Sequence, residues 1–583
     1  MIKSSVTACP LDCYDACGII YDEKRLKPFK DGHTNGFLCP HLNHYDKFDR
    51  IKKPRYKGKE ITMQEALEKL KELFASECKS DILHYRGNGN FGLLQEVTDH
   101  FFAQLGATLT NGTLCDGAGE AGIIEGRGSN KNMPLSEIKK SDVVIFWGRN
   151  PHTTSSHILP FIKDKTIIVI DPIQTKIAQM ADLYLQIKPH TDIYLALLLA
   201  RFVQIEESLD EEYMEKYASG FEEYYELTQG VRIKATLENI GVTLGDIGDI
   251  LHMTIGKKVA IVCGVGIQKY RDGADTMRSI DAFAVALGLF GKEGCGVAYM
   301  GNSKEGIEPP FEIKAKRVSK VNTNFEVFDT VFIQGANPMA QMPDSLRVKN
   351  ALEKTSNVIY FGLYENETSE IADLVIPAKT FLEKDDIRAS YSHNGLMVMN
   401  KQIESDIGIS EYDLVAYLCK EFEIALKSEQ AYLQHFKNFG VKKINGCFEV
   451  EKRETLPYQN GFDTSDGEFV FLEEFETHEN KGEDEFNLIT SKSHSSLNSQ
   501  FNRDKYAYIN PSHGYSDGEN IKISSQNGSV VLAVKNDNRL RDDTLLIYSG
   551  TPGVNNLTSS KHSYEGKSAI FQENKVRIIK NKK

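Results

Sequence analysis

Residues 8–17, ACPLDCYDAC, place Cys9, Cys13 and Cys17 at intervals of four, and Cys39 follows within GFLCPHL. Three thiols in nine residues, joined by a fourth from a loop, can surround one compact ligand. Four thiolates suit zinc or an iron–sulfur cluster, and a group of three with one remote cysteine fits a [4Fe–4S] cluster better than two zinc-binding pairs. A disulfide framework is the third interpretation, although the 583 residues include only ten cysteines. The spacing therefore predicts one [4Fe–4S] cluster.

The length and charge describe a multidomain enzyme. A chain of 583 residues exceeds one hydrophobic core, so we expect three or four domains. Its net charge of −13 argues against nucleic acid as the main partner. The longest apolar run, residues 193–205, carries Arg201 and predicts a buried helix with no direct membrane insertion. Without a signal-peptide pattern or paired arginines, the expected location is cytoplasmic.

The region after the cysteines alternates short β-branched runs with helical periodicities as far as residue 430, which predicts parallel α/β layers. A helix is expected after Thr62, which can form a capping box with Glu65. The clearest strands end in Gly or Asp, where ligands of doubly wound sheets bind. They lie at residues 141–148, 165–171, 258–264, 329–335 and 357–362.

An internal repeat links two of these strands. VVIFWGRNP at 143–151 recurs as VFIQGANP at 331–338, and an Ala-Asp-Leu turn follows each copy. Two similar α/β halves suggest two similar ligands, or one ligand with pseudo-twofold symmetry. The alternative is that G-x-N-P is only strand-to-turn chemistry. Beyond an acidic stretch at 471–485, short strands separated by NG, DG and DN turns predict a small β-barrel.

These motifs together resemble the molybdopterin oxidoreductases of the dimethyl sulfoxide reductase superfamily over nearly the whole chain. The most specific segments are CPLDC at 9–13, the two repeat copies, and PGVNNLT at 552–558. The resemblance implies an α/β protein with a small [4Fe–4S] domain, two intertwined doubly wound parallel-sheet domains and a C-terminal all-β barrel. The expected boundaries are 1–57 for the cluster domain, 58–470 for the molybdopterin-binding core (58–120 with 300–430 as one half, 121–299 as the other), 471–485 for an acidic linker and 486–583 for the dinucleotide-binding barrel.

The resemblance also implies molybdenum or tungsten held by a bis(molybdopterin guanine dinucleotide). Asp171 ends a strand, where an acid can accept from a ribose or a guanine edge. Asp192 matches a guanine-binding acid, and its alternative is a helix N-terminal acid. Gly264 and Gly266 would allow close approach of a phosphate. The full set of expected cofactor contacts is Gly148, Asn150, Asp171, Asp192, Gly264, Gly266, Gly335, Asn337, Thr490, Lys492 and Asn555.

The protein ligand to the metal is expected at Cys115, on the glycine-rich loop GTLCDGAG. A thiolate is a soft anionic ligand that suits these metals, whereas the alternative is a small buried cysteine. Asp116 is the candidate second ligand or proton carrier. Two departures stand out: His41 replaces a lysine that relatives often carry, and Asp116 stands where formate dehydrogenases have histidine.

The predicted function is two-electron oxygen-atom or hydride-equivalent transfer at the metal, with the cluster relaying electrons. We expect a reductase of an oxyanion, a sulfur compound or an N- or S-oxide. The alternatives are a formate-type dehydrogenase and a silent redox subunit that keeps only the cluster. Beside a small-molecule substrate, the expected partner is an acidic electron-transfer protein or redox subunit. It would dock on the basic stretch 47–59, which could also be a solvated loop.

Overall fold

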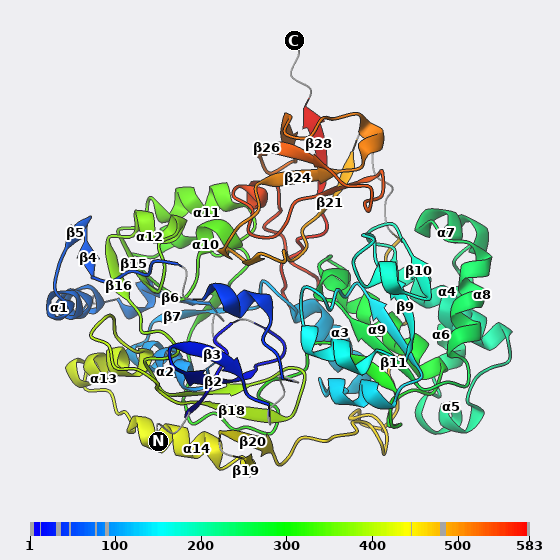
Figure 1. Cartoon of the computed structure of the whole chain (residues 1–583), viewed down its shortest axis with the longest axis horizontal. Helices are drawn as coiled ribbons and strands as arrows, with labels where there is room; N and C mark the ends of the chain where they lie inside the picture. The colour runs from blue at the N-terminus through cyan, green and yellow to red at the C-terminus, as the bar shows by residue number, and fades with distance from the viewer. Residues whose placement is uncertain are drawn as a thin grey trace. The chain divides into compact units, whose positions relative to one another are not determined.

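The computed structural model describes residues 5–11, 13–30, 36–45, 48–75, 78–87, 92–444, 446–477 and 485–579. The chain forms two compact units (Figure 1). The first comprises Met1–Asn111, Ser303–Arg453 and His494–Arg503; the second comprises Gly112–Asn302, Glu454–Ser493 and Asp504–Lys583. Within the described ranges, every helix is too short or too polar to span a lipid bilayer.

The first unit begins with a small antiparallel sheet in the order β1-β2-β3. Its strands are β1 (Ser5–Ala8), β2 (Gly18–Asp22) and β3 (Arg25–Pro28). Ala8 pairs with Gly18, and the next backbone N–H, that of Cys9, donates to the carbonyl oxygen of Cys17 at 2.8 Å. The hairpin therefore brings two of the motif cysteines side by side.

An eight-stranded sheet follows in the order β13-β7-β6-β14-β15-β16-β4-β5. It is parallel from β13 to β16, and β4 and β5 add an antiparallel edge. All five residues of β14 are buried, as the unbroken β-branched run predicts. The strands are β4 (Arg55–Tyr56), β5 (Lys59–Glu60), β6 (Ile82–Arg86), β7 (Thr108–Asn111), β13 (Arg317–Ser319), β14 (Thr330–Gln334), β15 (Asn357–Gly362) and β16 (Leu374–Pro377).

The helices of this unit include α1 (Met63–Phe74), which starts at the predicted capping box of Thr62 and Glu65. Its apolar face buries Ala66, Leu67, Leu70 and Phe74, as the periodicity predicts. The others are α2 (Val97–Leu105), α10 (Pro338–Gln341), α11 (Ser345–Leu352), α12 (Glu367–Ile371), α13 (Glu411–Glu421) and α14 (Glu429–Lys437).

An antiparallel sheet in the order β17-β18-β20-β19 completes the first unit, together with the hairpin β22 (Ser496–Leu497) and β23 (Gln500–Phe501). The sequence predicts only parallel α/β layers as far as residue 430, so β17 and β18 are a difference from that expectation. Their pairing depends on β20, about fifty residues further on, which no local pattern indicates. The strands are β17 (Asp386–Ala389), β18 (Gly395–Met399), β19 (Gly440–Ile444) and β20 (Cys447–Val450).

The second unit contains a parallel sheet in the order β10-β9-β8-β11-β12. Helices α4, α6, α7 and α8 gather beside it in Figure 1. A buried ion pair between Arg127 and Asp281 joins α3 to α9. The strands are β8 (Val143–Trp147), β9 (Thr166–Ile170), β10 (Leu183–Leu185), β11 (Val259–Cys263) and β12 (Gly296–Ala298). The helices are α3 (Gly117–Arg127), α4 (Asp192–Ile205), α5 (Glu211–Tyr217), α6 (Phe221–Gln229), α7 (Ile233–Ile240), α8 (Leu244–Thr254) and α9 (Gly273–Ala286).

The same unit contains a closed six-stranded barrel in the order β21-β27-β24-β26-β25-β28, which confirms the predicted C-terminal barrel. Of the predicted acidic linker, Phe471 and Leu472 are buried, and residues 478–484 lie outside the described ranges. The barrel strands are β21 (Phe486–Ile489), β24 (Tyr506–Ile509), β25 (Asn520–Ser524), β26 (Ser529–Asn536), β27 (Thr544–Leu546) and β28 (Lys575–Ile579).

Candidate cofactor sites

The four motif cysteines lie in the first unit, and neither they nor the other six cysteines, all within the described ranges, form a disulfide. Cys9 and Cys17 are buried, whereas Cys13 and Cys39 are half-buried. Cys39 stands directly before a 3₁₀ turn, Pro40–His44. An apolar cluster surrounds Cys9 and Cys17 with side chains from four segments of the unit. It includes Leu11, Ile19, Phe29, Leu42, Phe381, Leu382, Met397, Met399 and Cys447.

The electrostatics of these thiols fit a bound metal centre. Burial together with the charge of Cys39 raises the pKa of Cys9 to about 12. Burial also raises the pKa of Cys13 and of Cys17, and the charges of Asp15 and of neighbouring cysteines add to both shifts. Thiols that oppose one another's ionisation in this way need a positive centre among them if all are to bind as thiolates. Four sulfur donors around one centre fit an iron–sulfur cluster, so the predicted ligands suit that group.

Two further side chains accompany this site. The guanidinium of Arg388 on β17 is fully buried, donates to the carbonyl oxygen of Leu11 at 3.1 Å and partly opposes the rise in the pKa of Cys9. No local sequence pattern indicates this hydrogen bond, because Leu11 lies 377 residues away. His41 lies two residues after Cys39, and its ring centroid is 6.4 Å from that of His494.

The predicted metal ligand Cys115 lies in the second unit, two residues before α3, and is half-buried. Its backbone N–H donates to the Thr113 hydroxyl at 2.9 Å, and its carbonyl oxygen accepts from the Gln268 amide at 2.8 Å. Gly117 must be glycine, because a Cβ there would lie 2.6 Å from the carbonyl oxygen of Gly566. A half-buried thiol on a loop held by its neighbours is suited to binding a metal.

The strand ends of the five-stranded sheet bring several expected cofactor contacts to one edge. Gly148 follows β8 with φ +61°, and Gly264 follows β11. The glycine at 264 serves internal packing, because a Cβ would lie 1.7 Å from the carbonyl oxygen of Gly148. A Cβ on Gly266 would meet no atom within 4 Å, so this backbone has room for a ligand beside it. Asn150 closes its own turn, accepting from the N–H of His152 at 3.2 Å and donating to the Thr153 hydroxyl at 3.1 Å.

Two carboxylates at this edge fit a ligand that carries N–H or O–H donors. Asp171 follows β9, and burial together with the charge of Asp192 raises its pKa to about 7. Its Oδ1 accepts from the N–H of Ile173 at 2.8 Å. Asp192 is the first residue of α4, and its Oδ1 accepts from the indole N–H of Trp147 at 2.7 Å. Donors from a ligand would stabilise both carboxylates in this apolar setting.

The second repeat copy, in the first unit, is built differently from the first. Gly335 follows β14 with φ +54°, and a Cβ there would meet no atom. Asn337 is buried, and its amide donates to Glu367 at 2.8 Å and to the Ser499 hydroxyl at 3.2 Å. Its Oδ1 accepts from the Thr368 hydroxyl at 2.8 Å. Because both amide hydrogens are engaged by protein groups, Asn337 shapes the loop, and the open backbone at Gly335 is the better place for a ligand.

The expected contacts in the barrel region lie around the end of β21. The backbone N–H of Thr490 donates to the Gln572 side chain at 3.1 Å, and Lys492 is exposed. Asn555 is buried in the 3₁₀ turn Val554–Asn556, where its Oδ1 accepts from the Thr558 hydroxyl at 3.2 Å. Thr490 is thus tied to the segment that contains Gln572, whereas Asn555 is held within its own turn.

The basic stretch after Cys39 is largely paired with carboxylates. Arg50 forms a bidentate pair with Glu383, with bonds of 2.6 and 2.8 Å. Arg55 pairs with Glu365, and Lys53 lies 2.7 Å from Glu60. Lys52 is exposed, 3.8 Å from Asp49, and Lys57 and Lys59 are also exposed. Lys47 lies outside the described residues. The positive charge available to a partner is therefore smaller than the sequence suggests.

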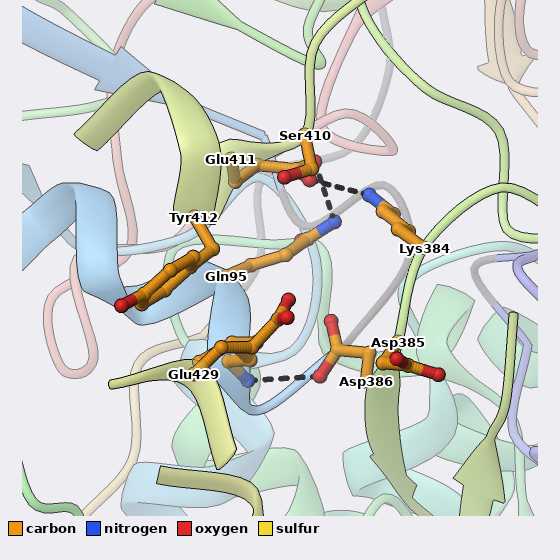
Figure 2. Close-up of a pocket in the computed structure, with 9 residues that line it drawn as sticks. Gln95, Lys384, Asp385, Asp386, Ser410, Glu411, Tyr412 and Glu429 are labelled. Atoms are coloured by element: carbon orange, nitrogen blue, oxygen red, sulfur yellow. Dashed lines mark hydrogen bonds and ion pairs between the residues drawn. The ribbon is translucent and has the colours of Figure 1, made fainter. Parts of the chain in front are cut away.

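A pocket in the first unit lies apart from the motif residues (Figure 2). Its volume of about 10 Å³ has room for about one water molecule. Lys384 pairs with Glu411 at 2.5 Å, and Glu429 and Asp386 direct their carboxyl groups toward the same space. Burial raises the pKa of Glu429 to about 7 and that of Asp386 to about 6. The pocket thus holds the buried Asp386 and the half-buried Glu429, and the pKa of each carboxyl group is raised toward neutral pH.

Comparisons with known proteins agree with this architecture. A family model described as molybdopterin oxidoreductase matches residues 78–405. The probable oxidoreductase YyaE of Bacillus subtilis is 28% identical over 71% of this chain and 68% of its own length. The probable oxidoreductase YoaE of the same organism is 24% identical over 98% of both chains. The solved structure of acetylene hydratase from Pelobacter acetylenicus shares the fold, with a TM-score of 0.69, 16% identity, and coverage of 94% of this chain and 91% of its own.

Proposed function

The chain belongs to the molybdopterin oxidoreductase family, and we propose that it binds a [4Fe–4S] cluster and a molybdenum or tungsten bis(molybdopterin guanine dinucleotide). A pterin metal cofactor supplies two-electron chemistry at a substrate atom, and a cluster passes electrons singly. The observation that carries the proposal is the division of the thiols into two chemically different sets. Four thiols interact electrostatically, two of them within an apolar cluster, and one lies half-buried on a glycine-rich loop that hydrogen bonds hold in place.

The chain's own residues have three tasks in this proposal. Cys9, Cys13, Cys17 and Cys39 hold the cluster, and the surrounding apolar side chains exclude water from it. Cys115 supplies a thiolate to the metal, where a soft anionic ligand is favoured. Asp171 and Asp192 accept hydrogen bonds from the guanine edge or ribose hydroxyls, and the open backbone at Gly266 and Gly335 leaves room for the phosphate and pterin parts.

We propose that the reaction is reduction of an oxyanion, a sulfur compound or an N- or S-oxide. The formate-type alternative is less favoured, because Asp116 follows Cys115 where formate dehydrogenases have a histidine. Electrons would come from a separate redox protein or subunit. Asp116 would hold or release a proton beside the substrate, as its position next to the metal ligand suggests.

The decisive experiment is metal and cofactor analysis of anaerobically purified protein. We expect about one molybdenum or tungsten per chain, four iron atoms with inorganic sulfide, and pterin fluorescence after oxidation. Oxidation of reduced viologen by a panel of oxyanions and N- or S-oxides would then identify the substrate class, with formate oxidation as the comparison. Stoichiometric zinc without sulfide would contradict the cluster, and iron without pterin would support the silent redox subunit.

The assignment of Cys115 has its own test. Cys115→Ala should retain iron, pterin and metal, which other groups also hold, and should lower turnover at least about a hundredfold. X-ray absorption should show one sulfur fewer around the metal. An unchanged sulfur shell with full activity would exclude Cys115 as the ligand.

A further inference from the structure

We propose that Gln268 is the positioning residue for the metal-binding thiol of Cys115, because its side-chain amide fixes both ends of the peptide segment that presents this thiol. The inference rests on the proposed role of Cys115 and extends it to a residue outside the predicted site. Gln268 ends the 3₁₀ turn Val265–Gln268, which follows the strand end of β11. It lies 153 residues from Cys115 in sequence, and no local motif connects the two.

Both the nitrogen and the oxygen of the Gln268 side-chain amide make hydrogen bonds to backbone groups. Nε2 donates to the carbonyl oxygen of Cys115 at 2.8 Å and to that of Val265 at 2.9 Å. Oε1 accepts from the backbone N–H of Gly119 at 3.0 Å. The side chain is 0% exposed, so water cannot replace these bonds. One amide therefore ties the metal-ligand loop to the end of β11 and to the first turn of α3.

The bond to Gly119 has a further consequence for α3. Asp116 is the N-cap residue of this helix, and its side chain makes no capping bond. Gly119 is the third residue of the helix, whose N–H an N-cap side chain would ordinarily bind. Gln268 supplies that acceptor from another part of the chain, so α3 starts at a fixed place without using Asp116 as a cap. Asp116 and Gly117 therefore lie between two groups that Gln268 holds in place, the carbonyl oxygen of Cys115 and the backbone N–H of Gly119.

The bond to the Cys115 carbonyl oxygen sets the direction of the thiol. Fixing this oxygen fixes the peptide plane between Cys115 and Asp116, and hence the backbone from which the Cβ–Sγ group projects. The Thr113 hydroxyl fixes the preceding side through the Cys115 N–H at 2.9 Å. A metal ligand must be held within a few tenths of an ångström, and such precision comes from supporting hydrogen bonds of this kind.

The test uses three full-length variants in the metal-loaded protein. Gln268→Glu keeps an oxygen that can accept from the Gly119 N–H but loses the N–H group that donates to the Cys115 carbonyl oxygen. Gln268→Met loses both the acceptor and the donor. Asn574→Asp is the matched control, because Asn574 is 5% exposed, donates to two carbonyl oxygens at 3.2 and 3.1 Å and accepts from one backbone N–H at 2.9 Å. It makes the same set of bonds in the barrel region without contacting the Cys115 loop. All three are compared by thermal unfolding and by iron and metal content.

The readout is the rate at which N-ethylmaleimide labels Cys115, measured by mass spectrometry of its peptide. In the loaded wild type, the metal should protect this thiol. We expect labelling about tenfold faster or more in both Gln268 variants, since each loses at least one buried hydrogen bond that presents the thiol. Asn574→Asp should keep the wild-type rate while unfolding at a similarly lowered temperature.

Two outcomes would overturn the inference, and they differ in what else they affect. If Cys115 is labelled no faster in the two Gln268 variants than in Asn574→Asp, Gln268 has only a structural role. Cys115 can still be the metal ligand in that case. If wild-type Cys115 is labelled equally fast with and without the metal, the assignment of Cys115 itself fails, and the role of Gln268 fails with it.

Discussion

At the scale of single residues, the chain uses chemically identical side chains for different purposes. Cys447 and Cys17 belong to one apolar cluster and are both buried. Burial raises the pKa of both thiols. Only Cys17 lies in the closely spaced motif, where the charges of Asp15 and of the other motif cysteines raise its pKa further. Burial alone therefore does not distinguish a metal ligand from a packing residue, whereas the mutual electrostatic effect does.

This difference predicts opposite results for two Cys→Ser variants. Cys17→Ser should lose most of the cluster iron and bleach the visible absorption, because serine is a poor ligand for iron in this setting. Cys447→Ser should keep the iron and cost about 1 kcal/mol of stability, since it only places a hydroxyl in an apolar cluster. Iron content and visible spectra of the two proteins provide the measurement. Equal iron in both variants would show that Cys17 is not a ligand.

The two asparagines of the repeated motif also differ in their tasks. Asn337→Ala should cost about 2–4 kcal/mol, because it leaves the buried Thr368 hydroxyl without its acceptor and removes one hydrogen bond from the half-buried Glu367, which Arg503 still contacts. Asn150→Ala removes only two local turn bonds and should cost about 0.5–2 kcal/mol. Denaturant unfolding of the cofactor-free chain measures both. Equal losses would mean that the two copies are energetically equivalent, contrary to their different contacts.

At the scale of elements, local sequence predicts what local physics determines. The strands β8, β9, β11, β14 and β15, the capping box of α1 and the barrel all follow from short-range patterns. The bonds of Gln268 to Cys115 and of Arg388 to Leu11 join residues 153 and 377 positions apart, so no window of sequence contains them. The sequence therefore predicts the candidate ligands, and the contacts that support them become visible only in the fold.

The start of α14 gives a prediction for pH dependence. Burial and the charges of Asp385, Asp413 and Asp386 raise the folded-state pKa of Glu429 to about 7, while Lys401 opposes the shift. The unfolded chain releases this proton first, so folding stability falls as pH rises from about 4.5 to about 7. Glu429→Gln removes that loss. After allowance for its partial exposure, the variant should be more stable by about 1 kcal/mol at pH 8.

Thermal unfolding at pH 5.5 and pH 8.5 measures this effect. The stabilisation by Glu429→Gln should be larger at the higher pH, where wild-type Glu429 is ionised. Glu222→Gln is the control, because Glu222 also lies in the first turn of a helix, α6, but is exposed. If the stabilisation by Glu429→Gln is the same at both pH values, the pKa of Glu429 is not raised in the folded protein.

At the scale of the whole molecule, the chain passes repeatedly between its two units. Each unit is built from three separate segments, so five crossings connect them. The four motif cysteines lie in one unit and Cys115 lies in the other. No contiguous half of the sequence contains a complete unit, and we therefore expect deletion of either half to prevent folding of both.

The last prediction concerns the electron-transfer partner. Among the described residues of this stretch, Lys52, Lys57 and Lys59 are the most available to an acidic partner. Lys52 makes only a long contact of 3.8 Å with Asp49, whereas Arg50, Lys53 and Arg55 are closely paired with carboxylates. Arg55 also donates to the carbonyl oxygen of Ser369 at 2.8 Å, so reversing its charge would disturb the fold as well as the surface. Reversal of the three exposed lysines to Glu leaves those structural pairs intact. It is therefore the cleaner test of docking.

This triple variant should slow reduction by an acidic carrier such as a ferredoxin about three- to tenfold at low salt, because steering by opposite charge is lost. The difference should shrink near physiological ionic strength, where charges are screened over ~8 Å. Reduction by a small viologen should not change, which separates docking from damage to the cluster. Lys349, Lys354 and Lys420, which are exposed elsewhere in the same unit, form the control triple with an equal change of charge. If both triples slow the carrier equally, only net charge matters, and the stretch after Cys39 is a solvated loop.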